Sequence, residues 1–282
     1  MKFQVHSDLE YQVLQPSTFI LNIHALRTAT QTVLEESLMV EPYIRLEEFS
    51  SALNANRFIR LEVTEPLIFK ISYKATVDTI SQIIDQKQEK GATPVVQLDG
   101  DIIPNLFPSR YCQSDKLQRL ANNKFGKIEN TFAQVIAITD WIYENVEYLS
   151  GSTNSQTSAY DTVSERAGVC RDFAHLGIAL CRALSIPARY FTAYAYNLNP
   201  PDFHACFEAY IGGHWLIFDA TKLAPLNGLV KIANGRDAAD AAVASIFGNV
   251  VCQSMQVTSE VLENNFEPFY YDNKQLKGLS YE

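Results

Sequence analysis

The chain has 282 residues, of which 47% are hydrophobic and 20% charged, a balance typical of a globular protein with a sizeable core. A net charge of −9 and the lack of any Lys/Arg run exclude nucleic acid and anionic membranes as favoured partners. The five cysteines are scattered and odd in number, which fits a reducing compartment better than a disulfide framework. The first residues lack the apolar core of a signal peptide, and no stretch is apolar enough to span a bilayer. We therefore expect a cytoplasmic protein.

The first hundred residues predict an antiparallel β-domain. Apolar residues alternate with polar or small ones from Phe19 to Ala25. Further strands are expected over residues 44–49, 58–63 and 67–75. Short strands in such a run favour a small sandwich, so we expect an N-terminal β-sandwich-like domain over residues 1–100 and a second domain over residues 101–282. The first domain carries no catalytic motif, and we expect it to shield one side of the second.

The second domain is expected to mix helices with strands. One helix should begin at Ser114 or Asp115, and another should cover residues 130–145, where apolar residues recur at helical spacing. Cys112 has no partner at metal-binding spacing and is interpreted as structural. The segments without a clear helical pattern are a linker with strand character at 81–105, an irregular stretch at 222–242, and a last strand of the same sheet at 249–257.

Residues 166–184, RAGVCRDFAHLGIALCRAL, place Cys170 on the first turn of a helix that Pro187 ends. Small residues at positions 170, 174, 177 and 181 share one helix face and would let a second element approach closely. The helix dipole favours a thiolate over a thiol at this end, so Cys170 is a candidate nucleophile. A buried, inert cysteine is the alternative. His175 lies around the helix from Cys170 and is not expected to act in catalysis.

Residues 203–221, FHACFEAYIGGHWLIFDAT, read as two alternating strands around the turn Gly212-Gly213. This turn pairs Ile211 with His214, so that His204 and Asp219 become diagonal neighbours whose side chains can meet on one face. A carboxylate directed at an imidazole fixes its tautomer for base catalysis. A structural histidine is the alternative, but the hairpin and the upstream cysteine together form a more specific pattern.

The blocks AGVCRDFAHLGIALCRALSIPAR and PPDFHACFEAYIGGHWLIFDAT resemble the bacterial transglutaminase-like superfamily, over roughly Leu106 to Met255. The resemblance implies a transglutaminase/papain-like α+β catalytic domain, so the expected fold class is α+β, with the cysteine at a helix start and the His and Asp on an antiparallel sheet. An N-terminal β-domain is also implied. Carried over residue by residue, Cys170 is the nucleophile, His204 its base and Asp219 the group that orients the base.

The chemistry expected from this resemblance is hydrolysis of an amide or peptide bond through a thioacyl intermediate. Two alternatives stay open: acyl transfer from protein glutamine, and a binding module that keeps the fold without activity. The expected partner is a peptide or protein substrate. Zinc-type spacings and calcium-type Asp/Asn loops are missing from the sequence, so no metal or cofactor is expected.

Substrate contacts are less specific in the sequence. Tyr194 and Tyr196 follow the cysteine helix, Trp215 lies on the hairpin, and all three are candidate substrate-contacting aromatics, with core packing as the alternative for the tyrosines. The resemblance places the polar loop 148–160 beside the nucleophile. A second oxyanion donor, besides the backbone N–H of Cys170, is expected from that loop, although the sequence does not identify the residue.

Overall fold

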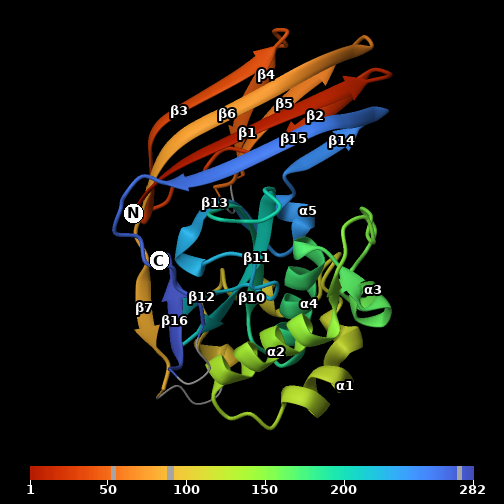
Figure 1. Ribbon diagram of the computed structural model, residues 1–282. Helices are drawn as coiled ribbons and strands as arrows, with labels where there is room; N and C mark the ends of the chain where they lie inside the picture. The colour runs from red at the N-terminus through yellow and green to blue at the C-terminus, as the bar shows by residue number, and fades with distance from the viewer. Residues whose placement is uncertain (52–54, 88–91, 272–274) are drawn as a thin grey trace.

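A computed structural model describes residues 1–51, 55–87, 92–271 and 275–282 and shows a β-sandwich stacked on an α+β unit (Figure 1). One sheet of the sandwich has the strand order β15 (Val250–Val261), β1 (Lys2–Val13), β6 (Leu67–Thr79), β3 (Gln31–Glu41). The other has the order β14 (Ala244–Phe247), β2 (Ser17–Leu21), β5 (Arg57–Val63), β4 (Leu46–Ser50). All of these pairs are antiparallel.

The sandwich core forms because buried and partly exposed residues alternate along β1, β2 and β6. Aromatic side chains fill the space between the two sheets: Phe19 contacts Phe69 at a ring-centroid distance of 5.1 Å and Tyr11 at 5.3 Å. The sandwich that the sequence predicts for the N-terminal region is therefore confirmed.

Late segments of the chain complete the sandwich. We predicted residues 249–257 as the last strand of the catalytic sheet. Instead, β15 is the edge strand of the first sandwich sheet and pairs with β1, from Phe3–Val261 to Val13–Val250. That prediction is wrong because the pattern of one strand does not say which sheet edge it joins. The domain boundary predicted at residue 100 divides the chain into two continuous segments. In space, the sandwich also includes β14 and β15, which come from the second segment.

The α+β unit is built on a four-stranded antiparallel sheet. Its order is β12 (His214–Phe218), β11 (Phe203–Ile211), β10 (Ala188–Ala195), β13 (Leu229–Gly235). The helices are α1 (Ser114–Phe125), α2 (Thr131–Asn145), α3 (Ala159–Glu165), α4 (Cys170–Ala183) and α5 (Ala238–Ala241). Short ladders join β7 (Gln82–Asp85) to β16 (Lys277–Ser280), and β8 (Glu147–Tyr148) to β9 (Ala167–Gly168). Single turns of 3-10 helix lie at η1 (Val95–Gln97), η2 (Ile103–Leu106) and η3 (Leu226–Gly228).

Helix α4 packs closely on the sheet because it carries a glycine where it crosses β11. A Cβ atom added to Gly177 would lie 2.5 Å from the ring of Phe207. The close approach expected from the small residues of this helix is therefore confirmed at Gly177. This contact sets how closely α4, the helix that begins at Cys170, packs on the sheet.

Buried hydrogen bonds join the two units. The Tyr194 hydroxyl donates to the Ile23 carbonyl at 2.6 Å and lies 3.0 Å from the Ser7 hydroxyl. The Gln31 amide bonds both the N–H and the carbonyl of Lys231, each at 2.8 Å. Among the described residues, no helix is long and apolar enough to cross a membrane.

Candidate active site

Cys170 is the first residue of α4 and is partly exposed. The Asp172 carboxylate accepts the backbone N–H of Val169 at 3.0 Å and therefore closes the helix start. Arg171 pairs with the same carboxylate at 3.0 Å. Asp172 and Arg171 thus hold the helix end that presents the thiol.

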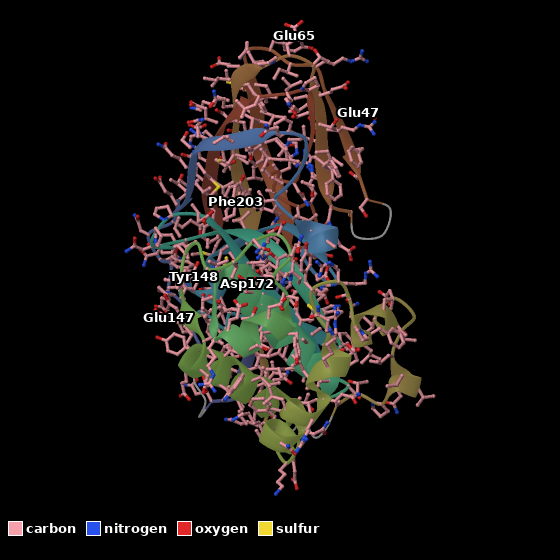
Figure 2. All side chains as sticks on the ribbon, turned by 90° about the vertical axis from the view of Figure 1, so that its right-hand side faces the viewer. Glu47, Glu65, Glu147, Tyr148, Asp172 and Phe203 are labelled. Atoms are coloured by element: carbon pink, nitrogen blue, oxygen red, sulfur yellow. The ribbon has the colours of Figure 1, made fainter. Side chains whose placement is uncertain are left out.

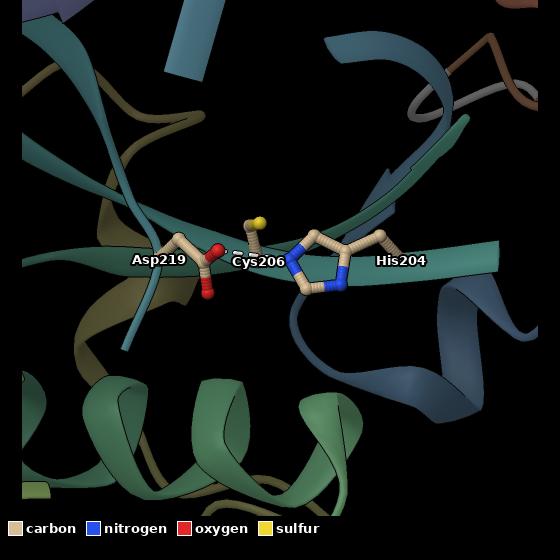
Figure 3. A group of neighbouring side chains, drawn as sticks. All are labelled: His204, Cys206 and Asp219. Atoms are coloured by element: carbon tan, nitrogen blue, oxygen red, sulfur yellow. Dashed lines mark hydrogen bonds and ion pairs between the residues drawn. The ribbon is translucent and has the colours of Figure 1, made fainter. Parts of the chain in front are cut away.

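The hairpin has the expected register. Ile211 pairs with His214 and Phe207 with Phe218, and both turn glycines have a positive φ. His204 Nε2 lies 2.9 Å from Asp219 Oδ2, with both side chains buried. Figure 3 shows the imidazole and the carboxylate pointing toward one another along the strand. Asp219 Oδ1 accepts both the N–H and the hydroxyl of Thr221, so the carboxylate cannot rotate freely.

The environment of the His204–Asp219 pair stabilises the charged form of both side chains. Burial alone would lower the pKa of His204, but the hydrogen-bonded Asp219 carboxylate and a contribution from the neighbouring Cys170 raise it well above its usual value. Burial would raise the pKa of Asp219, but His204 and Thr221 lower it. The geometry therefore favours an imidazolium beside an ionised carboxylate.

His204 has its second ring nitrogen available for Cys170. Nδ1 is buried and has no protein hydrogen bond of ordinary geometry within the described part of the chain, while Cys170 contributes to the His204 pKa as a hydrogen-bonding neighbour. Both residues line one cleft of about 630 Å³. The structure thus brings the three predicted catalytic residues together.

Cys206 is a site residue that the sequence interpretation left without a role. Its sulfur and the ligand atoms of His204 and Asp219 all lie within 4.8 Å of one another (Figure 3). Such a set could hold a soft divalent ion only by breaking the His204–Asp219 hydrogen bond. Burial raises the pKa of the Cys206 thiol to about 12, so at neutral pH it is a protonated neighbour and not a nucleophile.

Tyr148 is a second site residue that the sequence did not identify. It lies in β8, which pairs with β9 just before Cys170, and its ring contacts Phe173 at 5.7 Å. Burial and the neighbouring Cys170 raise the pKa of Tyr148 to about 12, so Tyr148 lies close enough to the nucleophile to be influenced by its charge. In the view of Figure 2, Tyr148 lies below Phe203 and at about the height of Asp172. Its place at the start of the predicted loop was the available signal.

The three predicted substrate-contacting aromatics lie elsewhere. Tyr194 is fully buried between the two units, and Trp215 is 3% exposed and stacks under Arg189 at 4.1 Å. Tyr196 packs on Phe266 at 5.1 Å. Since Tyr194 and Trp215 expose almost no surface, we correct their assignment to packing residues. Tyr196 is not among the residues that line the cleft.

His175 supports the cleft from below and takes no part in the pair. Its Nε2 accepts the N–H of Ala238 at 3.1 Å, and its ring stacks on Tyr111 at 5.0 Å. Burial lowers its pKa well below the usual value, so the ring is neutral. It therefore anchors α5, which forms one wall of the cleft.

A thiol at a helix start and an imidazole–carboxylate pair on an antiparallel sheet, which here line or adjoin one cleft, are groups typical of cysteine-dependent catalysis. Family models agree: residues 1–101 match the N-terminal domain of bacterial transglutaminase, and residues 118–220 match the transglutaminase-like superfamily. The chain belongs to the transglutaminase-like superfamily.

Individual relatives support this assignment. A crystal structure described as a "Putative Cysteine Protease" from Cytophaga hutchinsonii is 69% identical, covers 100% of this chain and 98% of its own, and superposes with a TM-score of 0.98. An uncharacterized protein of Mycobacterium leprae is 26% identical over 145 residues. That match covers 49% of this chain and 52% of the relative, so the chain spans about half the length of that relative. Together, family and neighbour indicate cysteine-dependent catalysis.

Proposed function

We propose that the protein hydrolyses amide bonds of a peptide or protein substrate through a Cys170–His204–Asp219 triad. The observation that carries this proposal is the buried 2.9 Å contact between His204 Nε2 and Asp219, which leaves Nδ1 for Cys170. Asp219 keeps the Nε2 proton in place, so that Nδ1 can take and return the thiol proton.

The reaction follows from these positions. The Cys170 thiolate attacks the substrate carbonyl, forming a C–S bond while the carbonyl electrons move to oxygen. The oxyanion collapses as His204 gives its proton to the leaving amine, and the C–N bond breaks to give a thioacyl enzyme. His204 then takes a proton from water, whose oxygen attacks the thioester and releases the acid and the Cys170 thiol. A primary amine in place of water would give transamidation.

Two donors are proposed for the oxyanion. The backbone N–H of Cys170 points from the start of α4, where helix N–H groups have no internal partner. The Tyr148 hydroxyl, whose pKa is influenced by the neighbouring Cys170, is the second.

The test is site-resolved alkylation of the five cysteines with limiting iodoacetamide from pH 5 to pH 9, read by peptide mass spectrometry. We expect Cys170 to label fastest, to keep labelling at the acidic end, and to slow in His204→Ala. Cys252 is an internal reference, because it is exposed and lies outside the cleft. If Cys170 labels no faster than Cys252, or labels equally in the absence of His204, the triad proposal fails and a non-catalytic module takes its place.

A further inference from the structure

Strand β14 presents an edge in the cleft that also holds the nucleophile. Among the strands of the described residues, it is the terminal strand of its sheet and has β2 as its one partner. All four of its residues line the cleft that Cys170 and His204 also line. The free edge of the sandwich therefore lies within the candidate active site.

The register shows which backbone groups point into the cleft. The Asn22 N–H donates to the Val243 carbonyl at 2.8 Å, and the ladder continues from Ala244–Leu21 to Phe247–Thr18. Hydrogen-bonded pairs alternate in an antiparallel ladder, so Ser245 and Phe247 bond to β2. The N–H and C=O groups of Ala244 and Ile246 then point away from β2. Within the described ranges, no protein hydrogen bond is recorded for them.

Proteins normally cover or charge such an edge, because it can pair with any extended chain. Here the exposed residues on the sandwich side of the cleft are mostly apolar: Ile246 and Phe247 on β14, and Met255 on β15. A volume of about 630 Å³ accommodates a short peptide rather than a folded partner. The edge and Cys170 line the same cleft, so a chain paired with β14 can extend toward the thiol.

We propose that the polypeptide substrate binds as an added strand on the outer edge of β14, with its scissile carbonyl at Cys170. Backbone bonds to Ala244 and Ile246 hold it in register, and its side chains contact the exposed Phe247 and Met255. The substrate class is therefore an extended segment with apolar side chains, selected mainly through its main chain. This inference rests on the proposed function for the reaction that follows binding.

Proline at position 246 provides a selective test, because it removes the N–H that faces the cleft and none that faces β2. The matched control is Ile246→Ala, which shortens the side chain but keeps the N–H. The probe is the peptidyl electrophile acetyl-Ala-Val-Leu chloromethyl ketone, whose carbon is attacked by the Cys170 thiolate as chloride leaves. Iodoacetamide, which has no peptide backbone to pair, reports whether the nucleophile is intact.

We expect Ile246→Pro to react with the peptidyl probe about fivefold to tenfold more slowly than Ile246→Ala, as the loss of one hydrogen bond predicts. Iodoacetamide should label Cys170 at the same rate in both variants. Equal peptidyl rates, or an equal fall with both reagents, would overturn the added-strand model. A β14-dependent dimer seen by sedimentation would also overturn it, because a second copy would then occupy the edge.

A second measurement uses only the natural chain. A series of peptidyl probes is methylated on one backbone nitrogen at a time, which removes one N–H donor from each. At least one of them should react about fivefold more slowly than the unmethylated probe, and uniform rates would overturn the proposal. Failure of the proposed function is distinguishable, because Cys170 would then show no enhanced reactivity even toward iodoacetamide.

Discussion

Tyr148 brings a phenol hydroxyl to the nucleophile from outside the two motif blocks. Tyr148 is near enough to Cys170 for the two groups to influence each other's charge, and we propose that its hydroxyl donates to the negative charge that develops on the substrate oxygen. We expect Tyr148→Phe to lower kcat about tenfold to hundredfold with little change in KM, because the donor acts chiefly in the transition state.

The matched control for this prediction is Tyr160→Phe, which removes the same hydroxyl from an exposed ring on α3. Steady-state kinetics on any hydrolysed peptide gives both constants. A Tyr148→Phe enzyme with the kcat of the Tyr160→Phe control would show that the hydroxyl stabilises no charge during the reaction.

A buried histidine in the sandwich should make stability depend on pH. His24 is 2% exposed, and burial together with Arg57 lowers its pKa to about 4. The unfolded chain binds this proton below about pH 6.5 and the folded chain only near pH 4, so acidification favours unfolding. The contribution of neutral His24 to the free energy of unfolding is fully present above pH 6.5 and is lost between pH 6.5 and pH 4. At pH 5 the loss is about 2 kcal/mol.

The check is denaturant unfolding at pH 7.5 and pH 5 for the natural protein and for His24→Phe, which keeps an aromatic ring against Tyr73. The loss of unfolding free energy between the two pH values should be about 2 kcal/mol smaller in the variant. An unchanged loss would mean that other groups cause the acid sensitivity.

At the scale of elements, the contact between α4 and β11 depends on Gly177. A methyl group there would meet Phe207, whose ring stacks on Phe218 at 5.5 Å and has little room to move. We expect Gly177→Ala to lower the unfolding free energy by about 1–3 kcal/mol despite the better helix propensity of alanine. Denaturant unfolding measures this, and Gly100→Ala is the control because nothing lies within 4 Å of its added Cβ. Equal stability of the two variants would contradict the packing argument.

Elements with strong local patterns could be predicted from the sequence. The α4 start and the 203–218 hairpin follow from short-range signals, and these two elements carry Cys170 and His204. The pairing of β15 depends on a partner more than 200 positions away and leaves no local signature. Strand β3 was not predicted because most of its residues are exposed and polar, so it lacks alternation.

In the candidate site, too, residues within local sequence patterns could be predicted, whereas residues that depend on tertiary contacts could not. The closeness of Cys170, His204 and Asp219 could be predicted because motif spacing and hairpin geometry constrain their positions. Tyr194 and Trp215 were misassigned because nearly all residues of β10, β11 and β12 are buried, so alternation cannot separate a core face from a cleft face. Tyr148 has an ordinary loop sequence and gains its role only from the ladder with β9.

At the scale of the whole molecule, the sandwich is not a contiguous domain. Residues 1–100 alone lack β14 and β15, which cover the edges of β2 and β1. We expect this fragment to show no cooperative thermal transition by circular dichroism, because two sheet edges and part of the core are left exposed. A fragment that adds residues 244–262 through a flexible linker should recover the transition. A cooperative transition in the shorter fragment would show that the late strands are dispensable.

The late arrival of β14 and β15 matters while the chain is being made. Synthesis proceeds from the N-terminus, so Cys170, His204 and Asp219 leave the ribosome before residues 244–261. A nascent chain at that stage has its reactive groups but only one side of the groove that would receive a substrate. On the added-strand proposal, recognition of polypeptides begins only after the last sandwich strands dock, so neighbouring nascent chains, which are themselves extended peptides, are spared until then.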